Sequence, residues 1–401
     1  MRFNIWKDCP KVPITELLSF IVDNRGKTVP TADDGWKLIA TNCVTNNTLF
    51  PVYEKVRYLT QETYETWFRA HPMPGDILFV NKGTPGRVCL VPDPVDFCIA
   101  QDMIALRADD EKIYNKYLFA VLRSREIQQQ IYNTNVGDVI PHFKKQFMDQ
   151  LLIPVPDRRI QEIIGNLYYE LSYKTELNKK INNNLLEQAL TLYATHFSSV
   201  DKNGCIGDYC AVKSGFAFKS SWWTNNGVKV IKIGSINQDN LNLLECSYVD
   251  EDKADKAKDF VVKAGDLLIA MTGATIGKFS MVPYSSEVLL VNQRVGKFFL
   301  GNHPVKKLPF IYCTLKQPEV YNEVVNRGQG SAQPNISASD IMSIPCVIPS
   351  QDVINDFNDA AQPLFDLIIS NQRENQQLSE LRNTLLPKLM SGELDVSNID
   401  L

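Results

Sequence analysis

The feature that most constrains the fold of this 401-residue chain is an internal duplication. The stretch MPGDILFVNKGTPGRV, from Met73, matches KAGDLLIAMTGATIGKF, from Lys263. Gly75 and Gly265 open the matching Gly-Asp pairs and are 190 residues apart. A repeat at fixed spacing indicates that each copy forms a structural unit of its own, which limits the folds open to the chain.

Further matches follow in the same order along both halves. GWKLIATNCV matches GVKVIKIGSI, and AQD, ending at Asp102, matches NQR, ending at Arg294. IPHFKKQFMDQLLIPVP then matches QPNISASDIMSIPCVIP, and QEII matches QDVI. The offset drifts only between 190 and 193 residues. The sequence therefore predicts two similar domains built on one plan.

Each copy has short β-like segments between Gly, Pro and Asn turns, followed by a long segment with helical periodicity. We predict an α/β (α+β) chain with long helices over about 159–197 and 352–390. The expected apolar stripes fall at steps of three and four: Ile160, Ile164, Leu167, Leu171, Ile181, Leu185 and Leu192, then Val353, Phe357, Ala360, Leu364, Leu367, Leu378, Leu381 and Leu385.

Stripes of this period are typical of coiled coils, although each helix could instead pack on its own domain. We expect the two helices to pair antiparallel and to place the globular domains in a pseudo-two-fold arrangement. Asn178 and Asn371 occupy equivalent seam positions, where a polar side chain fixes helix register. The alternative is that these asparagines turn outward to solvent.

The duplication also gives the expected domain limits. Globular domains are predicted at 1–157 and 199–350, a central helix at 158–198, and a C-terminal helix and tail at 351–401.

Composition excludes several classes of protein. No apolar run approaches the roughly 20 residues of a membrane span. The opening MRFNIWKDCPKVP lacks a signal-peptide pattern, and nine scattered cysteines without a C-x-x-C pair indicate reduced thiols. We therefore expect a cytoplasmic protein without a zinc site. The net charge of −4 and pI of about 5.7 argue against strong DNA binding by the chain alone.

Catalytic motifs are not found. TGATIGKF resembles a phosphate-binding loop, but its glycines are one residue too close and Phe279 replaces the required Ser or Thr. The sequence has no N/D-P-P-Y/F, H-E-x-x-H or G-x-S-x-G motif, and its four histidines are far apart. The EDK at Glu251 lies in a charge run typical of a solvated face. We predict a chain with no catalytic residues, no metal and no cofactor of its own.

Several segments together resemble the specificity (S) subunits of type I restriction-modification enzymes. LRNTLLPKLMSGELDVS resembles their C-terminal signature, and NNNLLEQALTLYATHF their central helical region. GDLLIAMTGATIGK, NQR and GQGSAQPNISASDIMSIPCVIP resemble parts of their target-recognition domains. The resemblance covers nearly the whole chain and includes the duplication.

The resemblance implies a non-catalytic subunit in which each domain reads one half of a bipartite, asymmetric double-stranded DNA site. The paired helices would set the spacer and dock two methyltransferase (M) subunits, which bind S-adenosylmethionine and methylate adenine. A restriction and translocation (R) subunit would join to cleave unmethylated DNA. The alternative function is a dimerising scaffold that binds protein partners, and a third is a nuclease or methyltransferase in its own right.

Base edges and phosphates are contacted by cationic and amide side chains on loops. In the first domain the candidates are Arg25, Lys27, Lys82, Thr84, Arg87, Gln101, His142, Lys144 and Lys145. In the second domain they are Lys213, Lys219, Lys232, Asn237, Thr272, Thr275, Lys278, Gln293, Arg294, Arg327, Ser331, Gln333 and Asn335. We expect Gly273 and Gly277 to let a strand turn approach DNA, the alternative being a plain surface hairpin.

Overall fold

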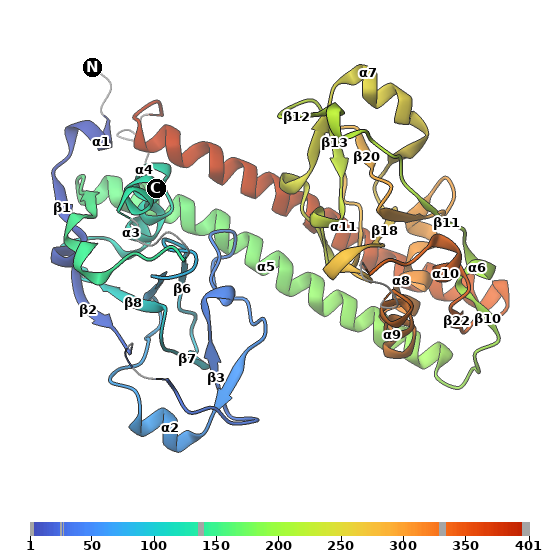
Figure 1. Ribbon diagram of the computed structural model, residues 1–401, viewed down its shortest axis with the longest axis horizontal. Helices are drawn as coiled ribbons and strands as arrows, with labels where there is room; N and C mark the ends of the chain where they lie inside the picture. The colour runs from blue at the N-terminus through green and yellow to red at the C-terminus, as the bar shows by residue number, and fades with distance from the viewer. Residues whose placement is uncertain (1–3, 25, 27, 135–139, 329–333, 395–401) are drawn as a thin grey trace. The chain divides into compact units, whose positions relative to one another are not determined.

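The computed structural model describes residues 4–24, 26, 28–134, 140–328 and 334–394, which form two compact units (Figure 1). The first unit combines residues 1–176 with 378–401, and the second spans 177–377. Each unit contains one copy of the duplicated domain together with parts of two long helices, α5 (Arg158–Phe197) and α11 (Gln351–Met390). These bounds agree with the helices predicted from the sequence to within one residue.

Two sheets form most of the first domain, beside an antiparallel pair of short strands, β1 (Lys11–Pro13) and β9 (Leu152–Pro154). One is antiparallel with strand order β2-β8-β5-β6, and the other has order β4-β3-β7, in which β3 and β7 are parallel. The strands are β2 (Leu18–Val22), β3 (Trp36–Ile39), β4 (Arg57–Leu59), β5 (Ile77–Val80), β6 (Val88–Leu90), β7 (Phe97–Ile99) and β8 (Met103–Ala108). Helices α3 (Asn115–Leu122) and α4 (Arg125–Asn133) follow β8.

The second domain repeats this plan. Its antiparallel sheet has order β11-β21-β18-β19, and its mixed sheet has order β12-β16-β13-β20-β17 with β13 and β20 parallel. The strands are β11 (Val212–Ser214), β12 (Trp223–Thr224), β13 (Val228–Ile231), β16 (Ser247–Val249), β17 (Val261–Val262), β18 (Leu267–Ala270), β19 (Phe279–Met281), β20 (Leu289–Val291) and β21 (Val295–Phe298). Helices α8 (Leu308–Lys316) and α9 (Pro318–Arg327) correspond to α3 and α4.

The duplication extends to individual hydrogen bonds. The carboxylate of Asp76 accepts from the Met73 N–H at 2.9 Å, and that of Asp266 accepts from the Lys263 N–H at 2.9 Å. In the glycine-containing turn that follows, the N–H of Gly83 and that of Gly273 each donate to a proline carbonyl, of Pro141 and Pro334 respectively, at 2.9 Å. Equivalent bonds at offsets of 190 to 193 residues confirm that the two domains share one backbone plan.

The long helices pack antiparallel within each unit. In the second unit, Asn178 Nδ2 donates to Glu374 Oε2 at 2.6 Å and to Asn375 Oδ1 at 3.0 Å. Asn371 Nδ2 donates to Asn182 Oδ1 at 2.8 Å. Residue numbers thus rise along α5 as they fall along α11. Both predicted register asparagines are buried and turn toward the partner helix.

In the first unit, the buried Arg382 of α11 lies against α5. Its Nη1 is 3.5 Å from Ser172 Oγ, and its guanidinium carbon lies 5.6 Å from the centre of the Tyr168 ring. Removal from water lowers the pKa of this guanidinium. The predicted coiled-coil pairing is therefore present in both units.

The predicted apolar stripe is wrong at five positions, whose side chains are exposed: Ile181, Val353, Ala360, Leu367 and Leu381. Their neighbours Ile354, Ile368 and Arg382 are buried instead. The reason is that α11 packs on its strand-rich domain as well as on α5, since Phe357, Ala361 and Phe365 belong to the domain core. A helix with two contacts buries a wider face, and its phase follows the 3.6-residue turn rather than a 3.5-residue seam.

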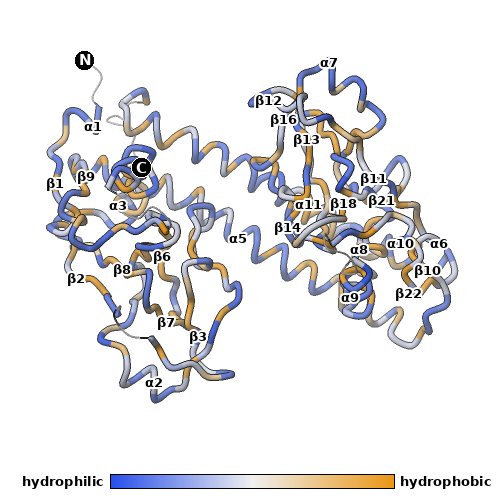
Figure 2. The backbone as a smooth tube through the Cα atoms, viewed as in Figure 1, coloured by the Kyte–Doolittle hydropathy of each residue, from blue (hydrophilic) through white to orange (hydrophobic). Residues whose placement is uncertain are grey.

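Apolar residues are concentrated on the strands and alternate with polar residues along α5 (Figure 2). Among the helices of the described residues, none combines the length and the hydropathy that crossing a membrane requires.

Candidate nucleic-acid interface

The turn between β18 and β19, which carries the sequence TGATIGK, is held by backbone bonds that its counterpart between β5 and β6 repeats. Gly273 N donates to Pro334 O at 2.9 Å, as Gly83 N does to Pro141 O at 2.9 Å. Residues 273–275 form a short 3-10 turn rather than a plain two-residue hairpin.

The two glycines of this turn have different tasks. Both have positive φ, 72° at Gly273 and 83° at Gly277. A Cβ on Gly277 would lie 3.0 Å from Val325 of α9, whereas one on Gly273 would meet only Ile233 at 4.0 Å. Gly277 therefore allows close packing of the turn on α9, and its expected role in letting the turn approach DNA stays a prediction. Gly273 leaves its side of the turn open.

In the second domain, several predicted loops meet at one end of the sheets. Lys232 follows β13, and Ile231 O accepts from the N–H of Asn292, at the end of β20. The N–H of Gln293 in turn donates to Phe216 O at 2.9 Å. Loops 215–219, 232–237 and 292–294 are thereby joined by backbone bonds.

The β18–β19 turn joins the same end. The N–H of Met271 donates to Arg294 O at 3.0 Å, and Thr272 forms an antiparallel bridge with Asn335. The side chains of Gln293, Arg294 and Asn335 are exposed there. The structure thus brings five separate segments together on one edge of the second domain.

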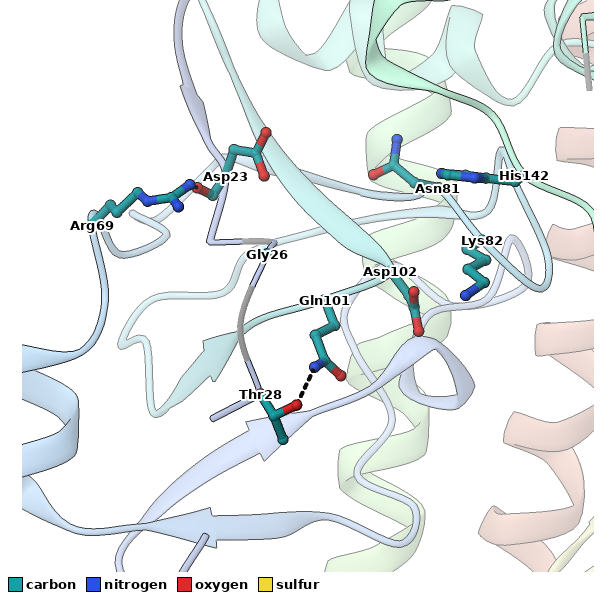
Figure 3. A pocket seen from close by; sticks show the side chains of 9 residues that line it. All are labelled: Asp23, Gly26, Thr28, Arg69, Asn81, Lys82, Gln101, Asp102 and His142. Carbon is teal, nitrogen blue, oxygen red and sulfur yellow. Dashed lines mark hydrogen bonds between the residues drawn. The ribbon is translucent and has the colours of Figure 1, made fainter. Parts of the chain in front are cut away.

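The equivalent edge of the first domain contains an open cavity of about 620 Å³ (Figure 3). Its lining includes the predicted residues Lys82, Gln101 and His142. Lys82 and His142 form a backbone bridge, as Thr272 and Asn335 do in the second domain. Gln101 Nε2 donates to Thr28 Oγ1 at 3.4 Å.

Charges of both signs surround this cavity. Asp23 and Asp102 contribute carboxylates to the lining, and Arg69 a guanidinium. Lys145, predicted as a DNA contact, pairs with Asp23 at 3.3 Å. The cavity therefore offers hydrogen-bond donors and acceptors side by side, as a surface that discriminates base edges needs.

Two predicted lysines of the second domain stack on tryptophans. Lys232 Nζ lies 3.4 Å from the centre of the Trp223 ring, and Lys219 Nζ lies 5.7 Å from that of Trp222. Burial lowers the pKa of the Lys232 ammonium. Lys253 and Lys256, from the charge run expected to be merely solvated, also face Trp222, at 5.9 and 5.3 Å.

Arg327 is already engaged by its own domain. Its guanidinium bonds Glu323 Oε1 at 2.8 Å, Asp340 O at 2.9 Å and Ser343 Oγ at 2.6 Å. These bonds tie α9 to α10 (Ala338–Met342) and give Arg327 a structural task.

Other predicted contacts lie beside these edges or outside the described residues. Lys213 is on β11 near the Phe299 ring, 5.0 Å from its centre. Exposed or half-buried side chains on neighbouring turns are Thr84, Arg87, Lys144, Asn237, Thr275 and Lys278. Four predicted residues lie outside the described part of the chain: Arg25, Lys27, Ser331 and Gln333.

The sequence reading missed Asp102 and Arg69. Asp102 stands opposite Arg294 in the AQD and NQR match, so the alignment itself was the available signal. Arg69 lies outside the motifs matched between the two copies, and the fold brings it to the cavity. Among the described residues, no three His, Cys, Asp or Glu side chains gather closely enough to hold a metal ion.

Comparison with known proteins places both domains in one family. The model of the type I restriction modification DNA specificity domain matches residues 13–187 and again 201–380. The chain is 22% identical over 323 residues to the type I restriction enzyme MjaVIII specificity subunit of Methanocaldococcus jannaschii, covering 75% of each chain. It is 23% identical over 353 residues to the MjaIX specificity subunit of the same organism, covering 81% of this chain and 79% of that relative.

A solved structure has the same fold. The S subunit of a type I restriction-modification system from M. genitalium superposes with a TM-score of 0.52 at 17% identity, covering 96% of both chains. The two family matches leave only short segments of the sequence unassigned, and their limits follow the duplication. The chain therefore belongs to the type I restriction-modification DNA specificity family, with two specificity domains in succession along its sequence.

Proposed function

We propose that the two domains read the two halves of a bipartite, asymmetric DNA site. The observation that carries the proposal is that the same edge of each domain, built by the same backbone bonds, presents different polar side chains. Lys82, Asp102 and His142 in the first domain correspond to Thr272, Arg294 and Asn335 in the second. Two domains that share one backbone arrangement but present different side chains are suited to recognising two different half-sites.

The antiparallel helices α5 and α11 would fix the distance between the half-sites. Half-sites on one face of DNA repeat every 34–36 Å, or about 10 base pairs. Exposed apolar side chains on the helices, such as Leu177, Ile181 and Leu367, suit the docking of two methyltransferase subunits. Those subunits would bind S-adenosylmethionine and methylate adenine, and restriction subunits would cleave unmethylated DNA.

Partner subunits also account for the charge of the chain. A net charge of −4 is unusual for a protein that binds DNA alone, since phosphate contacts dominate affinity. In the complex, the methyltransferase subunits would supply much of the phosphate contact. The specificity subunit would then contribute base recognition more than binding strength, and would have no catalytic residues of its own.

The test is to express the chain with the methyltransferase subunit of its own operon and to map adenine methylation by modification-sensitive sequencing. We expect a motif of two short half-sites separated by a fixed gap. A continuous motif, or no methylation from a stable complex, would contradict reading by two domains. If no complex formed, a scaffold that binds other proteins would explain the fold better.

A further inference from the structure

We propose that Asp102 and Arg294 are specificity-determining residues that give the two half-sites opposite hydrogen-bonding requirements. Arg294 would read the acceptor edge of a guanine, and Asp102 would read a base that presents an amino group in the major groove, cytosine or adenine. The inference rests on the proposed function and adds to it which chemistry each domain selects.

The two residues occupy one backbone position. Asn81 N, directly after β5, donates to Asp102 O at 2.7 Å, and Met271 N, directly after β18, donates to Arg294 O at 3.0 Å. Each residue is followed at once by the strand that pairs with β5 or β18, which is β8 or β21. A glutamine precedes each, Gln101 and Gln293. The side chains at this position therefore leave the same point of the two domain edges.

Both side chains are exposed. Asp102 lines the 620 Å³ cavity, and Figure 3 shows its carboxylate at the end of the turn that leads from Gln101, near the labelled Lys82. Lys82 and Arg69 are cations of the same lining, which offset the repulsion between a carboxylate and DNA phosphates. Arg294 has no equivalent cationic neighbour at position 272, where Thr272 replaces Lys82.

The backbone of the first domain is strained at this point. Gln101 has φ 36° and Asp102 has φ 40°, a left-handed conformation that aspartate adopts more readily than most residues but glutamine adopts infrequently. Strain of this kind persists where the surrounding structure imposes it and is concentrated at functional sites. The turn therefore presents Asp102 in an orientation that relaxed backbone would not give.

The chemistry of the two groups differs completely. A guanidinium has five donors and no acceptor, whereas an ionised carboxylate only accepts. In the major groove guanine offers O6 and N7 as acceptors, cytosine offers its N4 amino group, and adenine offers an N6 amino group beside N7. No base presents in the major groove both the two acceptors that a bidentate guanidinium needs and an amino group for a carboxylate, so the two domains are expected to select different bases at this position.

The experiment uses the full chain with its methyltransferase subunit and compares motifs between variants. Asp102→Gly removes the carboxylate while tolerating the positive φ, and Arg294→Gln removes the guanidinium. Asp110→Asn and Lys306→Gln change exposed charges elsewhere and serve as matched controls. Thermal unfolding of every variant checks that each one folds.

We expect Arg294→Gln to reduce discrimination at one G·C pair by roughly 5- to 150-fold, with the other half-site unchanged. Asp102→Gly should relax one position in the opposite half by a similar factor, and the base pair found there distinguishes cytosine from adenine. Replacing the guanine by 7-deazaguanine in synthetic duplexes removes N7, and should weaken methylation by the wild type but not further by Arg294→Gln. The same replacement in the Asp102 half should have no effect.

Relaxation at an A·T pair by Arg294→Gln, or an unchanged motif with folded Asp102→Gly, would overturn this inference while leaving the two-part reading intact. Relaxation of both half-sites by one variant would also overturn it. A wild type without a two-part motif would instead refute the proposed function, and this inference with it.

Discussion

The carboxylate of Asp76 accepts two hydrogen bonds from the guanidinium of Arg107, from Nε at 2.9 Å and from Nη2 at 2.9 Å. Asp76 is buried, and the bond from Met73 N–H closes the turn that precedes β5. In the second domain Lys297 pairs with Asp266 at 2.6 Å in the same place. This carboxylate therefore anchors the first strand of the central hairpin in both copies.

Asp76→Ala should lower the free energy of unfolding by about 2–3 kcal/mol, because it leaves Arg107 and a backbone N–H without their acceptor. The partial exposure of Arg107 places this below the loss for a fully buried pair. Urea unfolding measures it, with the exposed Asp110→Ala as control. A loss under about 1 kcal/mol would contradict an anchoring role.

Acidification should destabilise the first domain through His71. This imidazole stacks on Tyr64, with ring centres 4.0 Å apart, and burial lowers its pKa. A histidine with a lowered pKa stabilises the fold while neutral, so its contribution is complete above the unfolded pKa of about 6.5 and is lost as pH falls through the folded value. Between pH 7 and pH 5.5, the melting temperature of His71→Phe should therefore fall less than that of the wild type. Parallel curves would exclude His71 as the titrating group.

Arg327 and Lys278 should separate structural from DNA-binding effects. Arg327→Lys retains the charge but loses the planar set of donors that joins α9 to α10, so we expect a stability loss of about 1–3 kcal/mol. Lys278→Ala should leave stability within about 0.5 kcal/mol and weaken DNA binding by the complex. Thermal unfolding and salt-dependent binding measure the two effects. If Arg327→Lys were fully stable yet bound DNA poorly, Arg327 would be a DNA contact after all.

Replacement of Asn178 should weaken the pairing of α5 with α11. Asn178→Ala removes bonds to Glu374 and Asn375 from a site where the side chain is 1% exposed, and should cost about 1–3 kcal/mol. Asn183→Ala, on the exposed face of the same helix, should be neutral or slightly stabilising. Circular dichroism during urea unfolding distinguishes them, and equal curves for the two variants would refute a register role.

The repeated plan could be predicted from the sequence because few other residue types can replace a glycine with positive φ or a buried, hydrogen-bonded carboxylate. Gly273 and Asp266 match Gly83 and Asp76 for that reason. The ends of α5 and α11 could be predicted because Gly, Pro and Asn turns give way there to a long segment with helical periodicity. The phase of the helical stripe did not follow, since Leu367 and Ile368 are equally apolar and only packing on two surfaces selects Ile368.

The sequence predicts which loops form the candidate interface, but it does not predict every residue that lies there. Cationic and amide side chains are the common contacts to bases and phosphates, so that criterion does not select the carboxylate of Asp102, although the sequence aligns it with Arg294. Arg69 and Asp23 reach the cavity from segments far from the other loops, and no local pattern contains that information. Nor does composition predict that Arg327 is used within its own domain.

The division of α11 between the units has a consequence for how the chain is made. Leu386, Leu389 and Met390 belong to the core that contains Ile163 and Tyr168 of the first unit. Domains are synthesised from the N-terminus, yet this core is incomplete until residues 386–390 have been translated. A ribosome that stopped early would release an intact second core attached to an unfinished first one. Premature termination near residue 378 should therefore impair the domain encoded first, and proteolysis of the nascent product should begin at the N-terminal half.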